Sequence, residues 1–160
     1  MLCIMAVLAA LAQPSFKPMI DRWRVRDASD AIATTLYLAR AEAIRRGGRI
    51  VVERLAANCK QGGWGCGWRV YFDADSSGSF TANAAGDTLI QTFPALDGTA
   101  IKSSNSGLGQ IKFDRWGMNT VGAGFTIYPS SGNDQSPATI TLCIGSGGRI
   151  RTVAGAKCSS

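Results

Sequence analysis

The N-terminal third of the chain reads as one long amphipathic helix, and everything after it must pack against that helix. Between Lys17 and Arg46, apolar side chains recur every three or four residues, which places them on one helical face. This stripe consists of Val25, Ala28, Ile32, Leu36, Ala39 and Ala43. Gly47 and Gly48 follow directly and predict the end of the helix. Pro14 and Pro18 predict a kink near its start, because proline removes a backbone donor.

An uncharged apolar head, Met1–Ala12, precedes this helix. It is shorter than the ~20 apolar residues that a transmembrane helix needs. One interpretation is a secretory signal peptide cleaved after Ala12. The other is the end of a membrane helix whose first part lies upstream of Met1. We expect three segments: an apolar helix over residues 1–16, an amphipathic helix over 17–48 and a β-rich head over 49–160.

Only short strand patterns follow the helix, separated by glycine-rich or polar turns. The predicted strands are Ile50–Arg54, Gly67–Phe72, Leu89–Phe93, Ile111–Phe113, Gly124–Tyr128, Thr139–Ile144 and Arg149–Val153. One helix followed by strands alone indicates an α+β fold, in which antiparallel sheet packs on the apolar stripe of the helix.

The five cysteines favour an oxidising compartment. Cys3 lies in the apolar head, where we expect an inert thiol. The other four allow three pairings, and proximity in the sequence favours Cys59 with Cys66 and Cys143 with Cys158. No C-x-x-C spacing is present, so a zinc site is the weaker interpretation.

The composition argues against catalysis. There is no histidine, no G-x-S-x-G nucleophile motif and no lysine–serine pair at helical spacing. We therefore predict that the protein is not an enzyme and needs no cofactor. The net charge of +6 favours anionic partners without deciding among them.

Two loops resemble ligand-binding motifs without completing them. The run from Asp73 to Gly78 places oxygen ligands at alternate positions, as a calcium loop does, but the twelfth position is Ala84 instead of a glutamate. We expect a turn held by side-chain-to-backbone hydrogen bonds and no metal. The glycines of Gly145–Gly148 precede a strand, whereas phosphate-binding loops lead into a helix, so we expect a hairpin tip.

The most informative pattern is Gly148-Arg149-Ile150-Arg151. In a strand, Arg149 and Arg151 share a face and lie ~6.6–7 Å apart, close to the spacing of phosphates along one DNA strand. Guanidinium groups bind phosphate through forked hydrogen bonds. A Cys143–Cys158 bridge would hold them on a fixed surface, and Lys157 adds a third charge. The alternative is that the arginines only keep an exposed edge strand soluble.

Other residues could extend a nucleic-acid surface. Among the tryptophans we expect Trp64, in its glycine-rich turn, to be exposed enough to stack on bases, and Trp23, Trp68 and Trp116 to be core or structural. Lys102, Lys112 and Arg115 are further cations whose placement the sequence leaves open.

Three stretches resemble one known family. Pro14-Ser15-Phe16, the run Leu38–Gly47 (LARAEAIRRG) and the GWRVYFDADSSG hairpin are similar to the GspH/FimT family of minor type IV pilins and type II pseudopilins. The resemblance implies a long N-terminal helix packed on a β-rich head. Aligned on Pro14, the leader peptide and N-terminal glutamate of that family would lie just upstream of Met1.

The resemblance also implies a function. Gly148, Arg149 and Arg151 match, position by position, the DNA-contacting Gly-Arg-x-Arg motif of the FimT type, which acts in DNA uptake for natural transformation. It implies weak, electrostatic binding of double-stranded DNA, other pilin subunits as partners, and an inner-membrane anchor with a periplasmic head before assembly into a pilus. One alternative is a GspH-like structural pseudopilin of a type II secretion system that binds no DNA. Another is a secreted protein, unrelated to pili, that is cleaved after Ala12.

Overall fold

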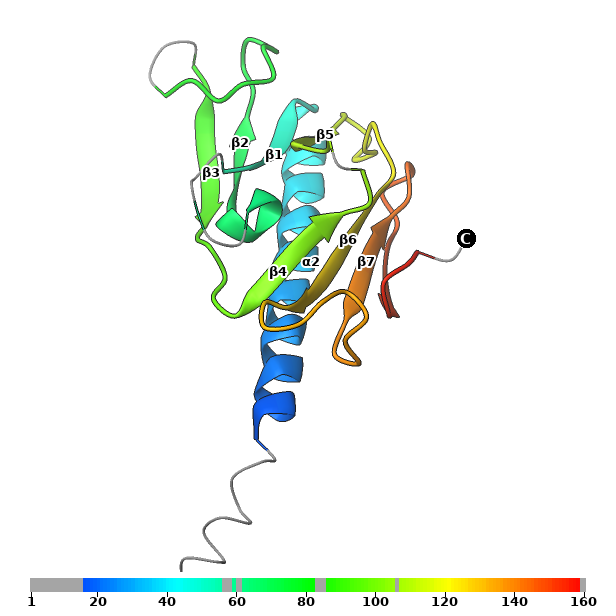
Figure 1. Ribbon diagram of the computed structural model, residues 1–160. Helices are drawn as coiled ribbons and strands as arrows, with labels where there is room; N and C mark the ends of the chain where they lie inside the picture. The colour runs from blue at the N-terminus through cyan, green and yellow to red at the C-terminus, as the bar shows by residue number, and fades with distance from the viewer. Residues whose placement is uncertain (1–15, 56–58, 60–61, 83–85, 106, 159–160) are drawn as a thin grey trace, which may run out of the picture.

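The computed structural model describes residues 16–55, 59, 62–82, 86–105 and 107–158. A 30-residue helix, α2 (Lys17–Arg46), forms the spine of the molecule (Figure 1). All six residues of the predicted stripe are buried. Gly47 ends the helix in the left-handed conformation (φ 78°) and donates its N–H to the Ala43 carbonyl. Pro18 lies in the first turn, where a missing N–H costs nothing, so it starts the helix instead of kinking it.

Two four-stranded antiparallel sheets follow, as the α+β prediction requires. The first has the order β3-β2-β1-β5 and the second the order β4-β6-β7-β8. Their bounds are β1 Ile50–Arg54, β2 Trp68–Phe72, β3 Thr88–Phe93, β4 Thr99–Ser103, β5 Gln110–Phe113, β6 Ala123–Pro129, β7 Ile140–Ile144 and β8 Ile150–Ala154. A short 3₁₀ helix, η1 (Gly63–Cys66), precedes β2.

Within the described residues, β4 is the one strand that the sequence prediction missed. Its sequence, TAIKS, contains alanine and lysine, which strands disfavour, and is only five residues long. Thr99 and Ile101 alternate inward and are buried, and the whole strand pairs with β6. Pairing with β6 and burial of one face therefore decide its structure, against its local propensity.

The helix packs against one side of both sheets, so a single core serves the whole head. From the first sheet the core takes Val52, Val70 and Ile111, and from the second Phe125 and Leu142. A hydrogen bond fixes the helix to the first sheet within this core: Trp68 Nε1 donates to Thr35 Oγ1 over 2.9 Å, and Thr35 in turn donates to the Ala31 carbonyl over 2.8 Å.

The turn containing Trp64 is a structural plug, and the prediction that this side chain is exposed is wrong. Trp64 is 3% exposed and packs edge-on against Phe125, with ring centroids 4.9 Å apart. Its Nε1 donates to the Leu108 carbonyl over 2.8 Å. The disulfide between Cys59 and Cys66 closes this turn. Trp64 belongs to η1, which lies between β1 and β2 of the first sheet, and Phe125 belongs to β6 of the second sheet. The tryptophan therefore fills the junction between the two sheets.

Both disulfides join the cysteines that proximity favours. Cys59 and Cys66 have Cα atoms 5.5 Å apart, and Cys143 and Cys158 have Cα atoms 5.8 Å apart. Cys3, Pro14 and the apolar head Met1–Ala12 lie outside the described residues. Among the residues that are described, no helix is long and apolar enough to cross a membrane.

The Thr35–Trp68 hydrogen bond gives a stability prediction. Thr35→Val keeps the side-chain shape but leaves the buried Trp68 N–H without an acceptor, which costs about 1–3 kcal/mol. Thr34 is the adjacent residue and is exposed, so Thr34→Val is the matched control and should change the free energy of unfolding by about 0.5 kcal/mol or less. Urea denaturation followed by tryptophan fluorescence measures both. Equal effects of the two variants would contradict this role for Thr35.

Candidate nucleic-acid interface

Strand β8 forms an edge of the second sheet and presents its arginines away from the helix. Arg151 pairs directly with Cys143 of β7, and residues opposite each other in an antiparallel pair share a face. The neighbouring β7 residues Leu142 and Ile144 belong to the core on the helix side. Cys143 and Arg151 therefore lie on the outer face, and Arg149, which directly precedes β8, lines the same hollow as Arg151.

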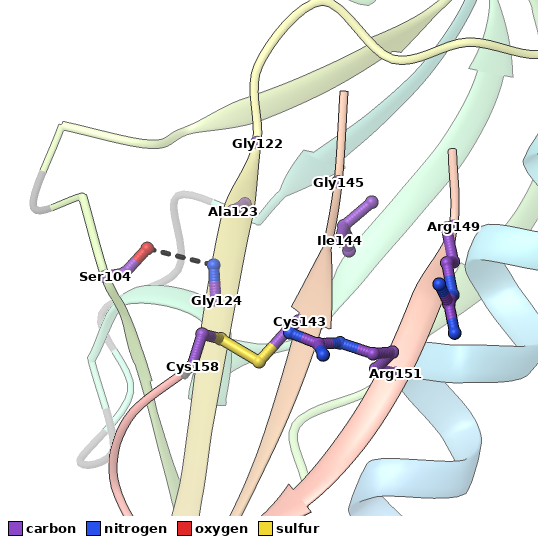
Figure 2. Close-up of a pocket in the computed structure, with 10 residues that line it drawn as sticks. All are labelled: Ser104, Gly122, Ala123, Gly124, Cys143, Ile144, Gly145, Arg149, Arg151 and Cys158. Carbon is purple, nitrogen blue, oxygen red and sulfur yellow. Dashed lines mark hydrogen bonds between the residues drawn. A yellow bond between two sulfur atoms is a disulfide. The ribbon is translucent and has the colours of Figure 1, made fainter. Parts of the chain in front are cut away.

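Both arginines line a hollow of about 480 Å³ on this outer face (Figure 2). The Arg151 side chain reaches across β7 toward the Cys143–Cys158 disulfide, and Arg149 lies beside it at the start of β8. The opposite wall consists of small residues, among them Gly124, where a Cβ atom would lie 2.9 Å from the Cys158 sulfur. Glycine at this position lets the disulfide lie flat on the sheet.

In addition to the disulfide, hydrogen bonds hold the C-terminal tail on the outer face of the second sheet. Gly155 donates its N–H to the Thr139 carbonyl over 2.9 Å and accepts from Thr141 Oγ1 over 2.6 Å. Thr126 Oγ1 donates to the Ala156 carbonyl over 3.3 Å. Strand β8 is thus held by its pairing with β7, and the tail that follows it is held by these hydrogen bonds.

Lys157 lies in a second hollow, of about 330 Å³, on the other side of the disulfide. Lys102 lines the same hollow and pairs with Asp134, Nζ to Oδ2, over 3.4 Å. A hydrogen bond from Gln135 and the Lys102 ammonium lower the pKa of the Asp134 carboxyl, which keeps it ionised. One carboxylate therefore offsets part of the positive charge around Lys157.

The charge around Arg149 is less compensated. Arg149, Arg151 and Lys157 are all exposed. Of the four ion pairs within the described part of the chain, none includes Arg149 or Lys157. The three cations predicted from the sequence thus share one face, with the two arginines in one hollow and the lysine in the next.

Gly148 is buried and sets the position where β8 begins. Its φ is +74°, and a Cβ atom there would lie 2.7 Å from the Gly117 carbonyl oxygen. Its N–H donates to the Gly145 carbonyl over 2.9 Å and to Asn119 Oδ1 over 3.1 Å, and its carbonyl accepts from Arg40 Nη1 over 3.0 Å. Glycine is required here both for its backbone conformation and for its close contact.

Sequence reasoning did not find the two side chains that hold this turn. Arg40 comes from α2 and Asn119 from the β5–β6 loop, far from Gly148 along the chain. Only the presence of Arg40 in the LARAEAIRRG run hinted at a role. Later in that run, Glu42 accepts hydrogen bonds from Arg45 and Arg46, which lower the pKa of its carboxyl. Arg40 is thus the arginine of that run that reaches across to the second sheet.

Two of the tryptophans lie on the surface, so the prediction that they are core or structural is wrong. Trp23 on α2 is 72% exposed and Trp116 on the Asp114–Gly117 turn is 71% exposed, whereas Trp68 is buried as predicted. The turn that carries Trp116 also carries the exposed Arg115, and its Gly117 lies against Gly148. Helical periodicity places Trp23 off the stripe, which was the signal available from the sequence.

Of the other predicted cations, only some adjoin this surface. Lys102 shares the hollow of Lys157, and Arg115 lies on the turn next to Gly148. Lys112 lies elsewhere: it is on β5 of the first sheet, and its ammonium lies beside Gly78.

The family of the chain can now be identified. Residues 28–157 match the model of the family described as type II transport protein GspH. The chain belongs to the GspH family. The match begins at Ala28, in the first half of α2, and runs into the C-terminal tail, so most of the helix and the arginine-bearing strand fall within it.

Solved structures share this fold. The type IV minor pilin FimU of Pseudomonas aeruginosa aligns at a TM-score of 0.61 and 19% identity, over 81% of this chain and 88% of that one. The minor pseudopilin EpsH of Vibrio cholerae aligns at a TM-score of 0.52 and 14% identity, over 82% and 97%. None of the curated proteins matches this chain. The expected fold, a pilin-like helix on antiparallel sheets, is confirmed for this GspH-family protein.

The environment of Gly148 gives a second prediction. Gly148→Ala forces an alanine into a left-handed conformation, which costs about 1–2 kcal/mol, and pushes its Cβ against Gly117. Gly147→Ala is the matched control, because no atom lies within 4 Å of its Cβ position. Thermal unfolding should show a lower midpoint for Gly148→Ala alone, and NMR shifts of the Arg149 amide should move with it. Similar behaviour of the two variants would show that the turn tolerates a side chain.

Proposed function

We propose that this GspH-family chain is a minor type IV pilin of the FimT type that binds double-stranded DNA during uptake for natural transformation. The observation that carries the proposal is the exposed pair Arg149 and Arg151, which line one hollow at the start of an edge strand whose backbone is held by a disulfide-linked tail and a buried glycine turn. Because the backbone that carries the two arginines is already ordered, little backbone freedom is lost when they bind phosphate.

The contacts in this proposal are electrostatic. Arg149 and Arg151 each meet a phosphate of one strand, and Lys157 meets a third beyond the disulfide. No side chain has to enter a groove, so binding is independent of base sequence. Two or three phosphate contacts give a slope of about −2 to −3 for log K against log[salt] and a Kd of about 10⁻⁴–10⁻⁶ M at physiological salt.

The other end of the molecule supports assembly with further pilin subunits. The first turns of α2 extend beyond both sheets (Figure 1). Four large apolar side chains on this part of the helix are exposed: Phe16, Met19, Ile20 and Trp23. In our proposal these residues pack against neighbouring subunits, and the preceding apolar segment anchors the protein in the inner membrane before assembly. The arginines of β8 lie on the head, away from this packing region.

A second candidate function is a structural minor pseudopilin of a type II secretion system. The description of the matching family and the likeness to EpsH favour it. In that role the protein acts only through helix and head contacts with other pseudopilins, and the basic surface is incidental. Neighbouring genes distinguish the two roles: secretion genes favour the pseudopilin, and minor-pilin or competence genes favour the DNA-binding pilin.

A titration with a short DNA duplex tests DNA binding. The double variant Arg149→Gln, Arg151→Gln should bind at least about tenfold more weakly, and its salt slope should fall to about −1, because two phosphate contacts are lost. The matched control, Arg22→Gln with Arg26→Gln, removes the same charge from exposed positions on α2 and should bind like the unmodified chain.

The result also separates the two candidate functions. Equal loss in both double variants would mean that net charge, and not the β8 surface, drives binding. Absence of binding by the unmodified chain at low salt would leave the structural pseudopilin as the function.

A further inference from the structure

The connection between β2 and β3 gathers three carboxylates at the end of the first sheet. Asp73 directly follows β2, Asp75 lies two residues later, and Asp87 directly precedes β3. One carboxylate oxygen from each lies within 4.8 Å of one from each of the others. Asp87 is distant from Asp73 and Asp75 in the sequence, and folding brings it next to this pair.

One oxygen of this cluster is buried and has no hydrogen-bond donor. Asp73 is 3% exposed, and its Oδ2 accepts from the Gly78 N–H over 2.9 Å. Its Oδ1 is fully buried and accepts no hydrogen bond from the described residues. A buried carboxylate oxygen without a donor or a cation is costly, so this atom requires a positively charged or hydrogen-donating partner.

The neighbouring cationic side chains do not supply that partner. The Lys112 ammonium lies beside Gly78, and Arg49 Nη1 donates to the Ala74 carbonyl over 2.6 Å. Within the described residues, neither forms an ion pair with Asp73, Asp75 or Asp87. Backbone N–H groups of the loop donate instead to the two outer carboxylates: Ala74 and Thr81 to the two oxygens of Asp87 over 2.9 and 3.0 Å, and Ser77 to Asp75 Oδ1 over 2.9 Å. These bonds leave Asp73 Oδ1 without a donor in the described part of the chain.

The loop has the layout of a calcium site with one ligand displaced. Counting from Asp73, the first, third and fifth positions are Asp73, Asp75 and Ser77, and the sixth is Gly78 with φ +76°. Calcium loops use the same positions for oxygen ligands and the same glycine for the sharp turn. The twelfth residue, Ala84, supplies no carboxylate, but Asp87, which comes three residues later, does so by its position in space.

We propose that Asp73, Asp75 and Asp87 bind a calcium ion at the β2–β3 connection. All three ligands are hard oxygens with no nitrogen or sulfur among them, which favours calcium or magnesium over zinc. An irregular loop suits the variable geometry of calcium better than the strict octahedron of magnesium. With three carboxylates in a partly exposed loop, affinity belongs in the range of extracellular modules, about 10⁻⁴–10⁻³ M.

Bound calcium would hold the loop over the outer face of the first sheet. Phe80, within this loop, packs on Tyr71 with ring centroids 5.2 Å apart, and Arg69 lies 4.7 Å from the Phe80 ring centroid. Bound calcium would therefore hold Phe80 over Tyr71 and would not affect β8, which belongs to the other sheet. This site is independent of DNA binding, and either can fail without the other.

Calcium titration of the full chain tests the site. After removal of divalent ions with EGTA and dialysis, CaCl₂ should raise the unfolding temperature in a saturable way, with half-saturation at about 10⁻⁴–10⁻³ M. NaCl at matched ionic strength should not, and MgCl₂ should act at least tenfold more weakly. Calcium should also slow amide hydrogen exchange of residues 74–82.

Variants locate the ion. Asp87→Asn and Asp75→Asn should each weaken calcium binding at least tenfold, and neither residue is buried, so both variants should fold. Asp114→Asn is the matched control, because Asp114, like Asp87, accepts two backbone hydrogen bonds in a turn but lies outside the cluster. This variant should bind calcium like the unmodified chain. The absence of a saturable response up to 10 mM CaCl₂, or unchanged binding by Asp87→Asn, would overturn the proposal.

Discussion

The apolar stripe of α2 is the contact on which the rest of the head depends. Its alanines, Ala28, Ala39 and Ala43, are almost completely buried, and their small size lets both sheets approach the helix closely. Longer side chains such as Leu36 fill the space between. Burial of apolar surface is the main favourable term in folding, so two sheets that share few direct contacts are held together chiefly by a common helix. The Trp64 plug closes the remaining junction.

The same helix also positions the surface that we propose binds DNA. Arg40 lies one residue beyond the buried Ala39 and reaches the Gly148 carbonyl, so the core packing of α2 and the start of β8 are linked by a single side chain. At the other end of β8, the Cys143–Cys158 disulfide and the threonine contacts fix the tail. A weak electrostatic site gains from such an ordered backbone, because little backbone entropy remains to be lost on binding.

Charge is distributed unequally over the two sheets. The carboxylates of Asp73, Asp75 and Asp87 gather at the β2–β3 connection of the first sheet, and the arginines of β8 lie on the outer edge of the second. The positive surface is therefore not opposed by the largest acidic cluster in the described part of the chain. This separation permits an anionic partner on one sheet and a cation on the other without competition between them.

The sequence by itself determined the helix, its buried stripe and its glycine end. It also determined seven of the eight strands to within one residue at each end, and both disulfide pairs, because these depend on local periodicity and short separations. It also placed Arg149 and Arg151 on one face, since alternation in a strand is a local property. Tertiary structure alone decided β4, whose pairing overrides its propensity, and the burial of Trp64 against a strand of the other sheet. It alone brought Arg40 and Asn119 to Gly148 and Asp87 to Asp73, because no local pattern encodes contacts between residues that are distant along the chain or separated by a loop.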